Sequence, residues 1–188
     1  MQRINLKNIK TMSFGEAIKS VFSKYATFSG RARRSEYWYF FLFTFLVGIV
    51  ASFIPIINLL WPLAIFIPTF AVSVRRLHDT GKSGWCLLLL ILPYLLLLGY
   101  VIYFFISIVM PYVGTSFADL NYIDSNTITE LLKNNVTSLL IIGALELINF
   151  VALIIWIVWM CKDSEPGTNQ YGPNPKETSN GDLNATVF

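Results

Sequence analysis

The chain has 188 residues, of which 55% are hydrophobic and only 13% are charged. A soluble domain carries about 25% charged residues, so the deficit excludes an ordinary water-soluble domain and favours a membrane protein. Fourteen basic and 11 acidic side chains give a net charge of +3. The two cysteines, Cys86 and Cys161, are too few and too far apart in sequence to indicate a disulfide framework or a metal site.

The N-terminal part is polar and then amphipathic. We expect residues 1–12 to be flexible, whereas residues 13–28 alternate apolar and charged side chains with the period of an α-helix. Ser13 and Glu16 have the spacing of a capping box. The segment is too charged to span a membrane, so we interpret it as an amphipathic helix at the membrane surface; the alternative is an ordinary helix packed on protein. The first apolar run begins only at Tyr37, beyond a cleavable leader, and we expect it to be retained.

Residues 37–74 contain no charged side chain. A spanning helix needs about 20 residues, so this length suits two spans joined by a tight turn. Pro55 and Asn58 are residue types that favour such a turn. The pattern therefore predicts spans near residues 37–54 and 59–74.

A short polar loop is predicted at residues 75–83, followed by a second charge-free stretch. We interpret that stretch as one span near residues 85–109; the alternative is a hairpin that turns near Gly99, with halves of about 14 residues, which is short for a crossing. A last span is predicted near residues 136–160. Together these segments predict an all-α integral membrane helical bundle of about four transmembrane helices, preceded by the amphipathic surface helix.

The outer loop and the tail complete the predicted organisation. Thr127 and Glu130, within the polar loop at residues 111–135, form a second capping-box pattern. The tail is rich in turn dipeptides, and beyond Lys176 we expect disorder. The resulting boundaries are residues 1–12 for a flexible basic N-terminus, 13–28 for the amphipathic helix, 29–162 for the transmembrane domain and 163–188 for a polar C-terminal tail.

Basic residues near span ends predict the orientation, because lysine and arginine are retained on the cytoplasmic side. With four spans, every basic residue except Lys133 falls on one side. That side, with the N-terminus, is predicted to be cytoplasmic. All five tryptophans, Trp156 included, fall near predicted span ends, as in an aromatic belt. Four of them are candidate interface anchors: Trp38, Trp61, Trp85 and Trp159.

Three sequence blocks stand out together. They are Phe28-Ser29-Gly30-Arg31-Ala32-Arg33-Arg34-Ser35-Glu36-Tyr37-Trp38, Arg75-Arg76-Leu77-His78-Asp79-Thr80-Gly81-Lys82-Ser83-Gly84-Trp85, and Pro166-Gly167 followed by Asn169 and Tyr171-Gly172-Pro173-Asn174-Pro175. This set, over about residues 12–176, resembles the bacterial inner-membrane family called domain of unknown function 805. The resemblance implies a small multi-pass protein of the bacterial inner (plasma) membrane. It implies no established activity, ligand or catalytic residue.

Two of these blocks place charged side chains on one predicted membrane face. The candidate site residues are Arg31, Arg33, Arg34, Glu36, Arg75, Arg76, His78, Asp79 and Lys82. Guanidinium groups bind phosphate through paired hydrogen bonds, and each basic residue near an anionic leaflet contributes about 1 kcal/mol. The functional hypothesis is therefore a site for an anionic lipid headgroup or an acidic partner. The alternative is a topology signal with internal ion pairs, such as Glu36 or Asp79 with an arginine.

Two local motifs give weaker signals. His78-Asp79 contains the single histidine, and no second set of ligands accompanies it, so we expect a hydrogen-bonded loop residue and no metal site. Gly81-Lys82-Ser83 resembles the end of a phosphate-binding loop. That motif requires a glycine where Arg76 stands, which excludes it.

Glu146 is the ionisable residue predicted to lie inside a span. Intramembrane carboxylates are costly, so it either handles protons or cations or is a protonated or snorkelling side chain. We expect a non-enzymatic membrane component that binds membrane lipids, anionic ones included, a protein partner or a second copy. The alternative is a transporter or channel subunit that uses Glu146. We expect no nucleic acid, metal or cofactor to be bound.

Overall fold

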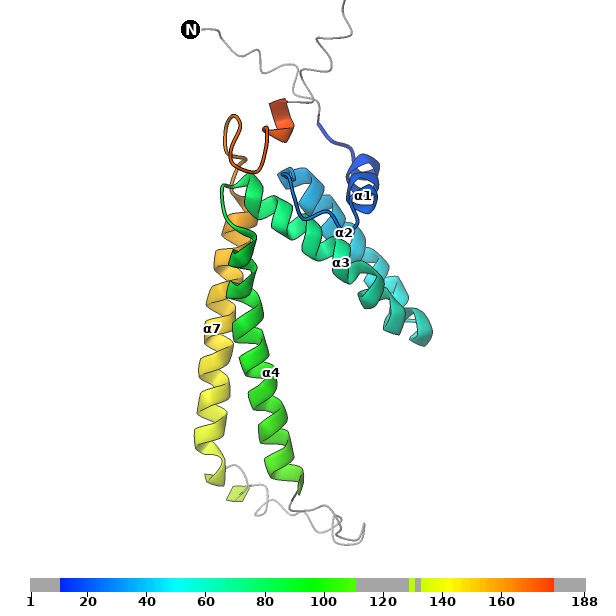
Figure 1. Cartoon of the computed structure of the whole chain (residues 1–188). Coiled ribbons are helices and arrows are strands. Elements are labelled where there is room, and N and C mark those ends of the chain that lie inside the picture. The colour runs from blue at the N-terminus through cyan, green and yellow to red at the C-terminus, as the bar shows by residue number, and fades with distance from the viewer. Residues whose placement is uncertain (1–10, 111–128, 131–132, 178–188) are drawn as a thin grey trace, which may run out of the picture. The chain divides into compact units, whose positions relative to one another are not determined.

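The computed structural model describes residues 11–110, 129–130 and 133–177. Its elements are α1 (Phe14–Ser23), α2 (Arg34–Ala51), α3 (Pro55–Asp79), the 3-10 turn η2 (Gly84–Leu87), α4 (Leu88–Val109) and α7 (Val136–Cys161). The described chain is all-helical apart from turns and one isolated bridge in the tail. It forms two compact units: one contains the residues up to Leu87 and those from Ile157 onward, and the other is the α4–α7 hairpin, Leu88–Trp156. Figure 1 labels the helices of both units.

Helix α1 begins at the predicted capping box, which the structure confirms. The Glu16 N–H donates to Ser13 Oγ at 3.3 Å, and the Ser13 N–H donates to Glu16 Oε2 at 2.8 Å. The helix ends at Ser23, five residues earlier than predicted. One face packs on α2, where the Phe22 ring meets Phe40 edge-on with centroids 5.7 Å apart. This face of α1 is therefore packed against protein.

The predicted turn at Pro55 and Asn58 is wrong. Helix α2 ends at Ala51, and α3 already begins at Pro55. Proline suits the first helical turn because its missing N–H would have no intrahelical partner there and its φ is already helical. Asn58 lies within the helix, since its N–H donates to the Ile54 carbonyl at 2.9 Å.

The predicted polar loop at residues 75–83 is also wrong over its first five residues, because α3 continues to Asp79. The helix then ends in a Schellman motif, in which the Gly81 and Lys82 N–H groups donate to the His78 and Leu77 carbonyls at 3.1 and 2.9 Å. Gly81 has φ +74°, the left-handed conformation that this cap requires. Charged residues remain helical here because they find partners inside the protein, as described below.

The α4–α7 hairpin is a pair of antiparallel helices (Figure 1). Helix α4 continues through Gly99 without a turn. Asn149 of α7 donates from Nδ2 to the Pro93 carbonyl of α4 at 3.3 Å. Few side chains of this unit are buried, among them Leu97 and Ala152, so most of its apolar surface is open to lipid or to another protein.

Three described helical stretches are long and apolar enough to span a membrane: Pro55–Asp79, Gly84–Ile108 and Val136–Cys161. Helix α2 is not among them; it has 18 residues and carries Arg34 and Glu36 in its first turn. Four spans were predicted, and three helical stretches meet the length and composition of a span. Thr127 of the second predicted capping box lies outside the described residues, as do most of the N-terminus expected to be flexible and the tail beyond Glu177.

Candidate functional site

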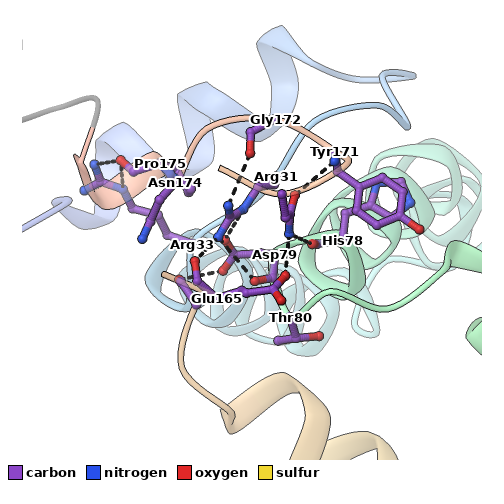
Figure 2. A network of polar contacts seen from close by, with 12 residues as sticks. Arg31, Arg33, His78, Asp79, Thr80, Glu165, Tyr171, Gly172, Asn174 and Pro175 are labelled. Carbon is purple, nitrogen blue, oxygen red and sulfur yellow. Dashed lines mark hydrogen bonds and ion pairs between the residues drawn. The ribbon is translucent and has the colours of Figure 1, made fainter. Parts of the chain in front are cut away.

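Asp79 is the centre of a buried polar network (Figure 2). Its side chain is fully buried, and it receives Arg31 Nε on Oδ1 at 3.0 Å and Arg76 Nη1 on Oδ2 at 2.5 Å. The tail reaches the same residue, because Ser164 Oγ donates to Oδ2 at 2.6 Å and the Glu165 N–H donates to the Asp79 carbonyl at 2.9 Å. A buried carboxylate is stable only when it is paired, and two guanidinium groups supply that pairing. Asp79 thus joins the α1–α2 connection, α3 and the tail.

Arg31 holds the tail in place through main-chain carbonyls (Figure 2). Its Nη1 donates to the Gly167 and Gly172 carbonyls at 2.8 and 3.2 Å, and its Nη2 donates to the Glu165 carbonyl at 2.5 Å. Both glycines have positive φ, 68° and 129°, which lets the tail curl around the guanidinium. A planar guanidinium with five donors suits this cluster of acceptors.

Arg33 and Arg76 make equivalent contacts with other acceptors. Arg33 Nε donates to the Pro175 carbonyl at 2.9 Å (Figure 2). Arg76 Nη2 donates to the carbonyls of Met160, at 3.1 Å, and Lys162, so it satisfies acceptors that the end of α7 leaves unbonded. Burial lowers the pKa of Arg33, and the carboxylates of Glu36 and Asp79 oppose that shift.

A second buried ion pair joins the first three helices. Arg75 of α3 is 1% exposed, and its Nη1 donates to Glu36 Oε1 of α2 at 3.0 Å. Ser20 of α1 donates to the same oxygen at 3.1 Å. Arg75 Nε and Nη2 are buried with no hydrogen-bond partner in the described structure. Unsatisfied buried donors cost free energy, so this pair is the weaker of the two.

His78 contributes packing and hydrogen bonds in the last turn of α3, which corrects the predicted loop position. Its ring stacks on Tyr171 of the tail, with centroids 3.8 Å apart and planes 2° apart. Its Nδ1 lies 3.2 Å from the Gly30 carbonyl, and its own carbonyl accepts from Asn169 Nδ2 at 3.0 Å. Among the described residues, no group of three or more His, Cys, Asp or Glu side chains could hold a metal ion.

A group of basic side chains surrounds the C-terminal end of α7; we call Arg34, Lys82 and Lys162 the α7-end cluster. Arg34 is exposed, and its Nη1 donates to the Cys161 carbonyl at 3.3 Å. The Lys82 ammonium lies 4.5 Å from the centroid of the Trp159 ring, a cation–π contact, and Lys162 is exposed. Arg34 and Lys162 are therefore basic side chains that a ligand could reach, whereas Lys82 is half-buried.

A pocket of about 300 Å³ lies beside this cluster, lined by Thr80, Lys162, Asp163, Ser164, Glu165 and Pro166. The carboxylates of Asp163 and Glu165 make the pocket itself unsuited to an anion. Lys176 pairs with Asp163, and this hydrogen bond lowers the pKa of that carboxyl. An anionic ligand thus fits the α7-end cluster better than the pocket.

Buried positive charge exceeds buried negative charge in this unit. The buried charged side chains of the described structure are Arg31, Arg33, Arg75 and Arg76 on one side and Glu36 and Asp79 on the other. Main-chain carbonyls of the tail and of α7 accept the remaining guanidinium hydrogens, but they carry no full charge. The buried side chains of the described structure therefore carry two more positive than negative charges.

The other predicted residues lie elsewhere. Glu146 is exposed on α7 within the hairpin unit, with no hydrogen bond or ion pair to any described residue. Trp38 and Trp61 are half-buried beside phenylalanine rings, whereas Trp85 is 78% exposed. Their role as membrane anchors stays a prediction.

Sequence reasoning missed the acceptors in the tail. The groups that bind the arginines are mostly backbone carbonyls, which every residue has, so composition does not mark them. The available signal was the block of turn residues from Pro166 to Pro175, which stood out beside the two basic blocks.

Comparison with known proteins decides the family. The model of the family described as "Protein of unknown function (DUF805)" matches residues 25–173. The chain belongs to the DUF805 family. Inner membrane protein YhaH of Escherichia coli (strain K12) is 36% identical over 168 residues, which cover 83% of this chain and 93% of YhaH. Inner membrane protein YhaI of the same strain is 43% identical over 84 residues, which cover 40% of this chain and 71% of YhaI.

No solved structure matches the chain. The family match includes all three segments that meet at Asp79. Together with the apolar helices and the inner-membrane relatives, it makes this chain a member of an uncharacterised family of membrane proteins.

Proposed function

We propose that this DUF805 protein is a non-enzymatic component of the bacterial inner membrane that binds anionic phospholipid headgroups through the α7-end cluster. The observation that carries the proposal is the excess of buried guanidinium groups over buried carboxylates in the unit that contains the cluster. A phosphate group outside the network would offset part of this excess. The exposure of Arg34 and Lys162 supports this proposal, because both cations are accessible to a ligand.

The proposal includes a topology of four spans, α2, α3, α4 and α7, with the N-terminus in the cytoplasm. The distribution of basic residues supports it, because all of them except Lys133 then lie on the cytoplasmic side. In this topology α1 lies along the inner surface of the membrane. Its exposed Phe14 is suited to the boundary between headgroups and acyl chains.

The magnitude of binding follows from the number of exposed cations. Each contributes about 1 kcal/mol near an anionic leaflet, so removing two should weaken binding by roughly 10- to 30-fold. Arg75 and Arg76 are unsuitable for this test, because they are fully buried and hold the fold. Arg34 and Lys162 can be neutralised without removing a buried ion pair.

The experiment compares two double variants with the same loss of charge. Arg34→Gln with Lys162→Gln removes two cations of the cluster, and Lys19→Gln with Lys24→Gln removes one cation of α1 and the one at its C-cap. Native mass spectrometry of both variants in mixed phosphatidylglycerol and phosphatidylethanolamine should show loss of bound phosphatidylglycerol in the first variant and much smaller loss in the second. Equal retention in wild type and first variant would contradict the proposal, as would capture of an acidic protein by the cluster in place of lipid.

Transport through Glu146 is the second candidate, and the lack of a partner for that carboxyl in the described structure favours it. A proton path, however, needs a series of polar groups, and Asn149 one turn away already donates to Pro93 and Leu145. Proton flux in proteoliposomes would decide between the candidates. Flux that Glu146→Gln abolishes would support transport.

A further inference from the structure

Glu146 is an exposed carboxyl group among exposed apolar side chains. It lies about 15 Å along α7 from the first residue, Val136, close to the middle of a helix long enough to span a bilayer. The neighbouring side chains Leu147 and Ile148 are apolar and exposed. Ionisable groups at this depth are almost always paired with another group, yet the described residues of the hairpin supply no partner.

A glycine lies one turn from this carboxyl on the same face of the helix. Leu139, Gly143, Glu146 and Phe150 follow at intervals of four, three and four residues, which places them on one helical face. A Cβ added at Gly143 would meet nothing within 4 Å, so the notch above it is empty. Leu139 and Phe150 are 40% and 59% exposed. Ala152 is buried and lies about 120° around the helix from Glu146, so this exposed face is separate from the buried side of α7.

We propose that this face of α7 docks against the same face of a second copy of the chain, with the two Glu146 carboxyl groups hydrogen-bonded to each other. Rotation about a two-fold axis along the membrane normal keeps every atom at its depth, so each Glu146 meets its own counterpart. One protonated carboxyl donates its O–H to an oxygen of the other, which a single shared proton already permits. The open notch at Gly143 allows the two helix backbones to approach closely.

A second copy satisfies all features of this face at once. A different partner would need its own polar group at the depth of Glu146, whereas a second copy has one by symmetry. The exposed apolar side chains on both sides of Glu146 are then covered by identical ones. The inference concerns the hairpin alone and does not depend on lipid binding at the α7-end cluster.

Cysteine cross-linking in membranes tests the contact directly. In a background with Cys86→Ser and Cys161→Ser, Phe150→Cys lies on the proposed face. Ile148→Cys is the matched control, because Ile148 is exposed by 52% but lies about 200° around the helix from Phe150. We expect mild oxidation to give a disulfide-linked dimer with Phe150→Cys and little with Ile148→Cys.

Second-site variants then test the carboxyl pair. Glu146→Gln keeps a side chain that can hydrogen-bond to its counterpart and should retain the Phe150→Cys cross-link. Glu146→Leu and Gly143→Ile should each reduce it severalfold. The inference is overturned by cross-linking that is absent, equal at both cysteine positions or unchanged by Glu146→Leu. If another part of the same chain covered this face, cross-linking would be absent.

Discussion

The two units of this protein place their polar groups in opposite ways. The unit containing α1 to α3 and the tail buries four arginines and two carboxylates, which bond to segments distant in sequence. In the α4–α7 hairpin, a side-chain hydrogen bond from Asn149 to the Pro93 carbonyl joins the two helices. Charge pairing specifies which segments meet in the first unit, whereas the hairpin depends on apolar contact and leaves most of its surface for lipid or a partner.

The comparison also shows where each unit is vulnerable. Removing one member of a buried ion pair leaves an uncompensated charge, so single substitutions in the network should be severe. An exposed site on the hairpin has few neighbours to disturb, and most substitutions there should be mild.

The largest effect is expected for Asp79→Ala. The substitution leaves Arg31 and Arg76 buried without their carboxylate and removes the acceptor of Ser164. The free energy of unfolding should fall by about 3–5 kcal/mol, measured as thermal or denaturant unfolding in detergent. The control is Asp163→Ala, which removes the same charge from a side chain that is 69% exposed, and should cost no more than about 1 kcal/mol. Similar losses in both variants would contradict the role given to Asp79.

Glu36→Ala should give the next largest effect, about 3 kcal/mol, because it removes the carboxylate that pairs with Arg75. Two donors of Arg75 are already unsatisfied, so the pair is poorly compensated. Replacing both residues, Glu36→Leu with Arg75→Leu, should therefore recover stability to within about 1 kcal/mol of wild type. A double variant less stable than Glu36→Ala would show that the pair is better satisfied than this account holds.

Substitution of one glycine in each unit should have a smaller effect on stability. Gly81→Ala puts a side chain on a residue at φ +74° and its Cβ 2.7 Å from Glu165 Oε2, and should cost about 1–2 kcal/mol. Gly99→Ala in α4 meets nothing within 4 Å and should stabilise the helix by up to about 1 kcal/mol. Unfolding of both variants under the same conditions checks the contrast, which fails if the two shifts have the same sign.

The smallest expected effect is that of Tyr171→Ala, which removes the ring stacked on His78. Loss of an aromatic pair costs about 0.5–1.5 kcal/mol, and the consequence should be faster proteolytic cleavage of the tail. Tyr171→Phe keeps the stack and should be cleaved at the wild-type rate. Equal cleavage of both variants would exclude the stack as a tail contact.

Much of the architecture follows from local sequence, and much of the network does not. Ser13 and Glu16 mark the start of α1 because a capping box depends on neighbours three residues apart. Charge-free runs likewise indicate the apolar helices. Arg75 and Arg76, by contrast, resemble the end of a span, because the groups that allow them to be buried lie far away in sequence.

The partners in the buried ion pairs could likewise not be predicted from local sequence. An ion pair of Glu36 or Asp79 with an arginine was an explicit alternative, and the structure contains both. Which arginine pairs with which carboxylate depends on how α2 and α3 pack, and Arg31 and Asp79 are 48 residues apart. The acceptors of the tail could not be predicted, because a backbone carbonyl has no sequence signature.

The central claim is that the tail is fixed on the arginine network by Arg31 and Asp79. Hydrogen–deuterium exchange of residues 164–172 tests it most directly, since the Glu165 amide donates to the Asp79 carbonyl and the Asn169 and Gly172 amides bond within the curled tail. The account predicts slow exchange of this segment in the wild type and exchange close to that of a free peptide in Asp79→Ala. Exchange in the wild type as fast as in a peptide of the same sequence would contradict it.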